Sequence, residues 1–169
     1  MTRFGAVMAT YFATLGVGVS AFIHPAPKLI WNASGSVPIG LYAVHDERAL
    51  HVADLVVAKP PEPLATFLAD RRYLARGVPL LKHVAALPGH TVCRMDRAIT
   101  VDGLVVGEAL DRDRRGRPLP AWRGCRLIAP GEVFLMNRPP DSFDSRYFGP
   151  LPAAAIIGRA DPIWIKSEP

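Results

Sequence analysis

The sequence predicts a mainly β protein, in which an N-terminal membrane helix precedes one antiparallel β domain. The 169 residues include 17 prolines and 14 glycines, a composition typical of many short strands joined by turns. The dipeptide Asp102-Gly103 separates two apolar runs, which indicates a β-hairpin. Residues 4–23 contain no charged side chain. The chain is long enough for one domain with a core. We therefore expect a membrane anchor and link over residues 1–28 and a β domain over residues 29–169.

The charge-free run at residues 4–23 has the length of a membrane span. Twenty residues of helix rise about 30 Å, which matches the hydrocarbon core of a bilayer. Because Arg3 precedes the run, we expect a single-pass helix with the β domain on the outer side of the membrane. A cleaved signal peptide is the alternative, since Val19-Ser20-Ala21 resembles a cleavage site. Both interpretations export the rest of the chain.

Apolar runs bounded by turn residues predict the strands of the β domain. These runs cover residues 41–45, 55–58, 80–87, 99–101, 104–106, 133–136, 155–160 and 162–165. Helical spacing of apolar residues predicts one short surface helix within residues 62–74. Residues 137–149 are predicted to form a polar loop dense in Ser, Asp and Arg.

The charge pattern gives little reason to expect a nucleic-acid partner. The net charge is +5 at pH 7, which could attract an anionic surface. The densest basic segment alternates arginine with aspartate, and we interpret it as an exposed loop. Its charged residues are Asp111, Arg112, Asp113, Arg114, Arg115 and Arg117.

The two cysteines, Cys93 and Cys125, do not have the spacing of a zinc site, so no metal is predicted. In an exported domain they could form a disulfide that closes a loop of 33 residues counted inclusively. The chain-entropy model gives such a bond about 3–4 kcal/mol. Two separate buried thiols remain the other possibility.

Two short stretches contain candidate catalytic residues. Ser34-Gly35-Ser36 lies before Pro38 in a predicted turn, where a serine can present its hydroxyl and nearby N–H groups. Lys82 lies in the middle of an apolar strand that ends at a Pro-Gly turn. Lysine is rarely found inside such a strand, although an edge strand with the ammonium reaching water would also allow it.

Three stretches in this order resemble the conserved boxes of type I signal peptidases, the Ser/Lys proteases of family S26. They are Ser34-Gly-Ser36-x-Pro, then Leu-Lys82-His-Val-x-x-Leu-Pro-Gly, then Asn-Arg-x-x-x-Ser142-x-Asp144-Ser-Arg146. The run that begins at Ser36 reads Ser-x-Pro-x-Gly-Leu-Tyr, and this pattern is similar to that of the conjugative-transfer, TraF-type branch. The resemblance covers nearly the whole chain and implies a signal-peptidase-like antiparallel β fold.

The resemblance also implies roles for individual residues. Ser36 corresponds to the nucleophile, Lys82 to the general base, and Ser34 with the Ser36 N–H to the oxyanion hole. Ser142 corresponds to the serine that orients the lysine, and Asp144 with Arg146 to a structural ion pair. The loop lacks the Gly-Asp pair that leader peptidases have before Asn-Arg, and its spacing to the serine is one residue longer. Asn137 and Arg138 therefore receive no role.

The chemistry of a Ser/Lys pair requires a neutral lysine. A pKa near 8 needs a decrease of about 2.4 pH units from the usual lysine value, or roughly 3.3 kcal/mol, which burial can supply. A nearby carboxylate would oppose this decrease, so we expect Asp144 to pair with Arg146 instead. His83 is adjacent to Lys82 and should face the other side of the strand, so a histidine base is not expected.

These interpretations predict a membrane-anchored serine endopeptidase that needs no cofactor. The expected partners are the lipid bilayer and an exported pilin or other pre-protein, which is cleaved or, in the branch that the chain resembles, also cyclised. The expected location is the inner membrane, with the catalytic domain in the periplasm. A catalytically silent β domain of an envelope complex, with Ser36 and Lys82 far apart or Lys82 exposed, is the alternative. A self-cleaving repressor of the LexA type is disfavoured by the apolar N-terminus. The sequence does not predict the oligomeric state.

Overall fold

The computed structural model of the chain describes residues 3–20, 27–46 and 49–166. Its helices are α1 (Arg3–Ser20), α2 (Glu62–Asp70), α3 (Ser145–Phe148) and the 3-10 helix η1 (Ala153–Ala155). Its strands are β1 (Leu29–Asn32), β2 (Gly40–His45), β3 (Leu55–Ala58), β4 (Leu80–Ala86), β5 (Thr91–Met95), β6 (Ala98–Val101), β7 (Leu104–Glu108), β8 (Gly124–Leu127), β9 (Glu132–Leu135), β10 (Leu151–Pro152) and β11 (Ile156–Ile165).

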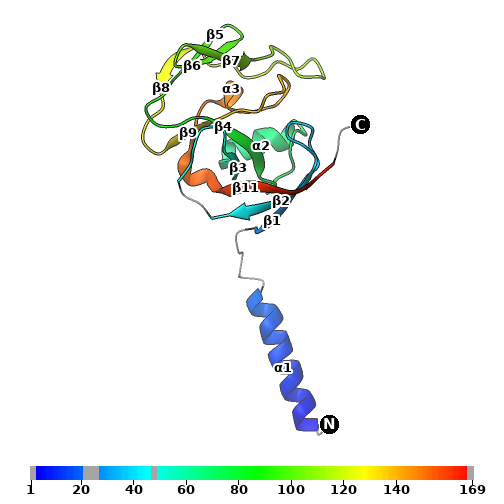
Figure 1. Cartoon of the computed structure of the whole chain (residues 1–169). Helices are drawn as coiled ribbons and strands as arrows, with labels where there is room; N and C mark the ends of the chain where they lie inside the picture. The colour runs from blue at the N-terminus through cyan, green and yellow to red at the C-terminus, as the bar shows by residue number, and fades with distance from the viewer. Residues whose placement is uncertain (1–2, 21–26, 47–48, 167–169) are drawn as a thin grey trace.

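The strands form two antiparallel sheets (Figure 1). The large sheet has the order β1-β2-β11-β3-β4-β9-β10, and the small sheet has the order β7-β6-β5-β8. The small sheet lies at one end of the β domain, with α3 between it and the large sheet. The predicted hairpin is confirmed, because β6 and β7 pair across Asp102-Gly103, and both turn residues have positive φ. The predicted mainly β architecture is therefore correct.

The core consists of three clusters of buried apolar side chains along the two sheets. Strand β4 lies inside the large sheet between β3 and β9, and Lys82 is paired with Val56 of β3. Only 5% of Lys82 is exposed. The alternative of an edge strand with a solvent-exposed lysine is therefore wrong, because both sides of β4 are covered by neighbouring strands.

The prediction of a transmembrane helix is not upheld. Helix α1 is present, but no helix in the described part of the chain is long and apolar enough to cross a membrane. Its 18 residues include Gly5, Gly16 and Gly18, which lower the mean hydropathy. The end of the predicted span, residues 21–23, lies outside the described residues. No residue of α1 is buried, and the helix extends away from the β domain (Figure 1).

Several elements differ from the sequence-based expectation. The two closing runs are one strand, β11, which stays continuous through a register shift between Pro162 and Trp164. Strands β1, β5 and β8 were not predicted. Polar or charged residues interrupt the short sequences of β5 and β8. The loop at residues 137–149 contains the single helical turn α3, which is capped by the Asp144 side chain through the Arg146 N–H.

Cys93 and Cys125 form a disulfide across the small sheet, which settles the choice left open by the sequence. The two residues are direct partners in the antiparallel pairing of β5 with β8. The bond links β5, which follows the strand that contains Lys82, to β8, which follows the long β7–β8 loop. It therefore closes the small sheet on the side opposite the β6–β7 hairpin.

We expect the double substitution Cys93→Ala/Cys125→Ala to lower the free energy of unfolding by about 3–4 kcal/mol, because the unfolded chain regains the entropy that the closed loop removes. Urea unfolding at neutral pH measures the difference. Treatment of the wild type with a strong thiol reductant should give a similar loss. A loss below about 1 kcal/mol in both experiments would show that the cross-link contributes little.

Candidate active site

The turn between β1 and β2 contains Ser34 and Ser36 and is held by the side chain of Asn32. The buried Asn32 amide Nδ2 donates to the carbonyl oxygens of Val37 and Pro38, both at 3.0 Å, and to that of Ser34 at 2.9 Å. Its Oδ1 accepts from the Ser34 backbone N–H and from the Ser34 hydroxyl at 2.8 Å. This network replaces the strand hydrogen bonds that the turn lacks and fixes the position of Ser36.

Gly40 closes this turn and lets two strands approach closely. A Cβ at this position would collide with the backbone oxygen of Trp164 in β11. The glycine in the Ser-x-Pro-x-Gly pattern is thus required by the close pairing of β2 with the end of β11. The pairing anchors the serine turn to the large sheet.

Ser36 is partly exposed, and its hydroxyl has two polar neighbours. The Asn137 Nδ2 donates to the Ser36 Oγ at 3.2 Å, and the Ser34 Oγ lies 3.4 Å from it. Since the amide donates, the Ser36 oxygen accepts this bond, and its own proton stays available to a base. A donor aimed at the Ser36 oxygen also stabilises negative charge there.

Lys82 is buried near Ser36, and its Nζ donates to the Ser142 Oγ at 2.7 Å. Burial lowers the pKa of Lys82 to about 8, an effect that the Asp144 carboxylate partly opposes and the Arg146 guanidinium reinforces. Both Lys82 and Ser36 line the same groove. Among the described residues, no hydrogen bond joins the Lys82 Nζ to the Ser36 Oγ. His83 does not line the groove; its Nδ1 lies 3.0 Å from the Asn137 Oδ1.

The ion pair expected between Asp144 and Arg146 is present and fully buried. The Arg146 Nε donates to the Asp144 Oδ1 at 2.7 Å, and its Nη2 donates to the Oδ2 at 3.0 Å. The Asp144 side chain is 0% exposed and the Arg146 side chain is 1% exposed. The guanidinium also donates to the Glu108 carbonyl at 2.9 Å and to that of Asn137. The pair therefore ties the loop before α3 to strand β7.

Asn137 is the site residue that the sequence analysis missed. Besides its bond to Ser36, its Nδ2 donates to the Leu81 carbonyl at 3.1 Å, and its Oδ1 accepts from the His83 N–H at 3.1 Å. Its own N–H donates to the Asp144 Oδ2 at 3.0 Å. A buried asparagine thus joins the serine turn, β4 and the Asp144 loop. The only sequence signal was its place in the third motif, which the missing Gly-Asp pair obscured.

These residues open into a groove of about 740 Å³. The serine turn, β4 and the Ser142 loop form one part of its wall, and apolar side chains such as Leu68, Tyr73 and Phe143 form another. Its size is that of an ordinary ligand pocket. In the described residues, no group of three or more His, Cys, Asp or Glu side chains is arranged to hold a metal ion.

Comparison with known proteins points to one family. The family model described as "Signal peptidase, peptidase S26" matches residues 1–165. A conjugal transfer protein TraF of Agrobacterium fabrum is 36% identical, over 79% of this chain and 80% of the relative. A probable TraF of Sinorhizobium fredii is 39% identical, over 78% and 74%. A plasmid transfer protein TraF of Escherichia coli is 30% identical, over 96% and 98%.

Among solved structures, a signal peptidase I from Enterococcus faecalis is similar to this chain at 20% identity and a TM-score of 0.41. The similarity covers 68% of this chain and 98% of that structure.

Replacing Lys82 with methionine should stabilise the protein at pH 7 by about 1–2 kcal/mol. Burial of the charged lysine costs about 3 kcal/mol, given folded and unfolded pKa values of about 8 and 10.5, and loss of the Ser142 hydrogen bond offsets part of the gain. The penalty is complete below pH 8 and disappears as the pH rises to 10.5, because the unfolded chain binds the extra proton in that window. The stabilisation by Lys82→Met should therefore decrease as the pH rises from about 8 to 10.5.

Urea unfolding of Lys82→Met and wild type at several pH values tests this expectation. The matched control is Lys59→Met, which removes an exposed lysine outside the groove and should change the free energy of unfolding by less than about 0.5 kcal/mol. A destabilised Lys82→Met protein at pH 7, or a stability difference independent of pH, would contradict a buried lysine with a low pKa.

Proposed function

The chain belongs to the peptidase S26 signal peptidase family, and from this premise we propose that it is a serine endopeptidase with Ser36 as nucleophile and Lys82 as general base. The observation that carries the proposal is the burial of Lys82, with a pKa near 8, in the groove that contains Ser36. A lysine with this pKa is substantially neutral at mildly alkaline pH, so it can take a proton from a serine hydroxyl. A silent β domain gives no reason to bury a lysine in a groove that contains a partly exposed serine.

In the proposed reaction, Ser36 attacks the carbonyl carbon of the scissile bond, which follows a small residue of the substrate. The proton of the Ser36 hydroxyl passes to the Lys82 amine. The Ser36 hydroxyl must first turn toward Lys82, because no hydrogen bond joins them in the free protein. Catalytic hydrogen bonds often form only with substrate bound. The Ser142 hydroxyl holds the Lys82 amine in place.

The negative charge of the tetrahedral intermediate falls on the former carbonyl oxygen. We assign its stabilisation to the Ser36 backbone N–H and the Ser34 hydroxyl. In the free protein the Ser34 hydroxyl donates to Asn32, and a hydroxyl can rotate to a new acceptor at low cost. One such donor contributes about a hundredfold to a thousandfold in kcat in other enzymes. Protonated Lys82 then gives its proton to the leaving amine, and the acyl-enzyme forms.

The relatives named above are conjugal or plasmid transfer proteins, so we assign the substrate to that process. The proposed substrate is an exported pilin-type precursor. Water as the acceptor would release a shortened chain. If the substrate's own amine were the acceptor, the product would be cyclic, with the same acyl-enzyme as intermediate.

The proposed location is the periplasmic face of the inner membrane. The disulfide supports an oxidising compartment. Exposed apolar residues at β1 and the end of β11 support contact with a bilayer, and Trp31 stacks on Trp164 there at a centroid distance of 5.7 Å. Those residues are Leu29, Trp31, Ile163, Trp164 and Ile165.

Substitution of either dyad member should abolish cleavage. We expect Ser36→Ala and Lys82→Ala to lower kcat more than a thousandfold, and Ser34→Ala to lower it about a hundredfold, because only one oxyanion donor is lost. Processing of a co-expressed pilin precursor, resolved by mass spectrometry, measures the effect. Lys59→Ala is the control and should keep full activity. Full activity of Ser36→Ala or Lys82→Ala would rule out the dyad.

The rate should follow the protonation of Lys82. Below a pH of about 8 the lysine is mostly charged and cannot accept a proton, so kcat/KM should rise with pH and level off above that value. Initial rates between about pH 6 and 10 on one peptide measure the profile. A flat profile, or a midpoint near 6.5 typical of histidine, would mean that another group is the base.

A further inference from the structure

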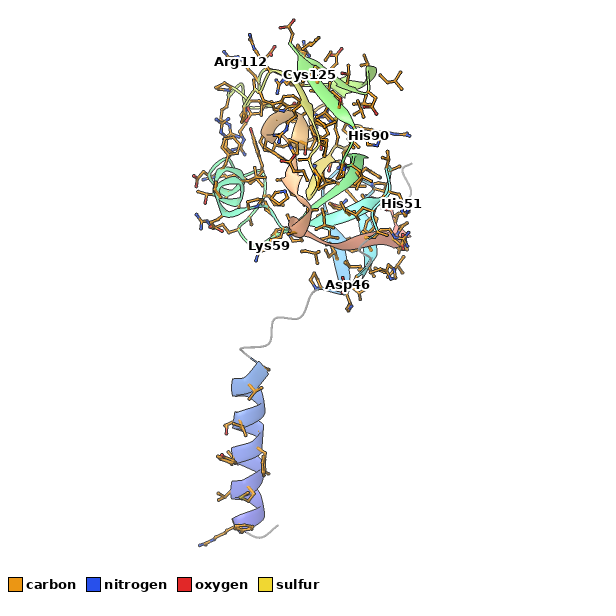
Figure 2. The ribbon with its side chains drawn as sticks, turned by 90° about the vertical axis from the view of Figure 1, so that its left-hand side faces the viewer. Asp46, His51, Lys59, His90, Arg112 and Cys125 are labelled. Carbon is orange, nitrogen blue, oxygen red and sulfur yellow. A yellow bond between two sulfur atoms is a disulfide. The ribbon has the colours of Figure 1, made fainter. Side chains whose placement is uncertain are left out.

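One part of the groove that contains Ser36 and Lys82 is lined by arginines. They follow α2 or belong to the loop between β7 and β8, and they are Arg71, Arg72, Arg114, Arg115 and Arg117. Among the described residues, two carboxylates line the same groove, those of Asp113 and Asp141. The proposed reaction uses none of these residues. The loop lies at the small-sheet end of the β domain, where Arg112 is labelled (Figure 2).

Both carboxylates are already engaged. Asp113 accepts from the Arg117 Nε at 2.7 Å and from the Tyr73 hydroxyl at 2.6 Å, and it also accepts backbone N–H groups of its own loop. Desolvation pushes the pKa of Asp113 upward, but these hydrogen bonds outweigh it and hold the pKa well below its usual range. Asp141 pairs with Arg114. Neither carboxylate is free to neutralise another arginine.

Three arginines of the groove are therefore left without a carboxylate. Within the described part of the chain, no acidic side chain is within ion-pair distance of Arg71, Arg72 or Arg115. Arg71 is held in another way: it donates to the Pro118 carbonyl at 2.8 Å and lies over the Phe67 ring at 4.8 Å. Arg72 and Arg115 are exposed, and their guanidinium groups are available to a ligand.

Arg72 also has an unfavourable backbone conformation. Its φ is +56°, the left-handed region in which glycine is favoured after a helix. A residue with a Cβ is strained in this region. An arginine at a position better suited to glycine is a local cost, and such costs are typical of functional sites.

We propose that the groove selects peptide substrates that carry a carboxylate close to the scissile bond, and that Arg72 and Arg115 bind this carboxylate. The inference rests on the proposed peptidase function, because it names the class of substrate for that same groove. Guanidinium groups form paired, charge-assisted hydrogen bonds with carboxylates. The carboxylate could belong to a Glu or Asp side chain or to the C-terminus of the substrate.

The place of the arginines favours a peptide over other anions. They share one cavity with the dyad and with apolar residues such as Leu80 and Phe143. An occupant of the whole cavity must therefore offer apolar side chains, a scissile carbonyl and a negative charge together. A peptide provides all three, whereas a phosphate of a nucleic acid or lipid would meet only the basic part.

A set of quenched fluorescent peptides tests the proposal with the full chain. The reference peptide has Ala before the scissile bond, no acidic residue and an amidated C-terminus. In the other peptides Glu or Gln replaces one residue at a time, up to about four residues on either side, and one further peptide has a free C-terminal carboxylate. We expect kcat/KM to be about five- to tenfold higher for Glu than for Gln at one position, or for the acid than for the amide at the C-terminus.

Arg72→Gln/Arg115→Gln should reduce this preference to about onefold while kcat/KM for the Gln peptides stays within about twofold of wild type. Arg72→Gly is a second variant that relieves the backbone strain, so it should be at least as stable as wild type and still lose part of the preference. The matched control is Arg123→Gln, which removes one positive charge from the same loop outside this groove. It should keep the full preference.

Equal rates of wild type on every Glu/Gln and acid/amide pair would overturn the proposal, as would an equal loss by the double variant on both members of a pair. Binding of the same peptides to Ser36→Ala separates this result from failure of the peptidase function. If wild type cleaves nothing, the peptidase function fails, but the tighter binding of the Glu or acid peptide, weakened by 1 M salt, still decides the inference. Equal binding there would overturn it.

Discussion

The buried ion pair of Arg146 with Asp144 is the interaction on which the geometry of the site depends. Its charges are removed from water, so each needs a full set of partners, and removal of either one would leave an uncompensated buried charge. The partners are backbone groups of Asn137, Glu108 and α3. Because these groups belong to different segments, the pair fixes the loop that contains Ser142 against both sheets. The lysine is then held by a hydroxyl in a position that the ion pair defines.

The same ion pair also governs the charge of Lys82. A carboxylate bound directly to the lysine would favour the ammonium, but the two oxygens of Asp144 are occupied by Arg146 and the Asn137 N–H. Burial can therefore prevail over the remaining attraction, and the pKa is lowered. Asn137 connects the second half of the site, since its side chain reaches Ser36 while its backbone binds Asp144. Serine and lysine are thus placed by one connected network.

The sequence was sufficient where a local pattern has one physical meaning. The Asp-Gly hairpin is of this kind. The burial of Lys82 was one of two interpretations of its strand, and the Asp144–Arg146 pair was implied by the family resemblance; the structure contains both. The sequence was insufficient where tertiary contacts decide. Strand β8 is exposed along its length and owes its place to pairing with β5. The length and the lack of charge of residues 4–23 suggested a membrane span, but no helix in the described part of the chain is long and apolar enough to form one. Asn137 received no role because its loop departs from the leader-peptidase pattern, and only the folded structure shows its contacts with Ser36, β4 and Asp144.

The alternating Arg and Asp residues of the β7–β8 loop are another feature whose role is decided by tertiary contacts. The alternation suggested an exposed loop. In the structure, Asp113 instead binds Tyr73 and Arg117, and the Arg117 Nη2 donates to the Arg71 carbonyl at 3.0 Å. These contacts fold the loop back onto the end of α2. The negative charge of Asp113 is therefore used to attach the loop, and Arg115 on the groove has no carboxylate partner among the described residues. The four arginines of this segment already outnumber its two aspartates, and the contacts of Asp113 leave the excess positive charge on the groove that also contains the serine and the lysine.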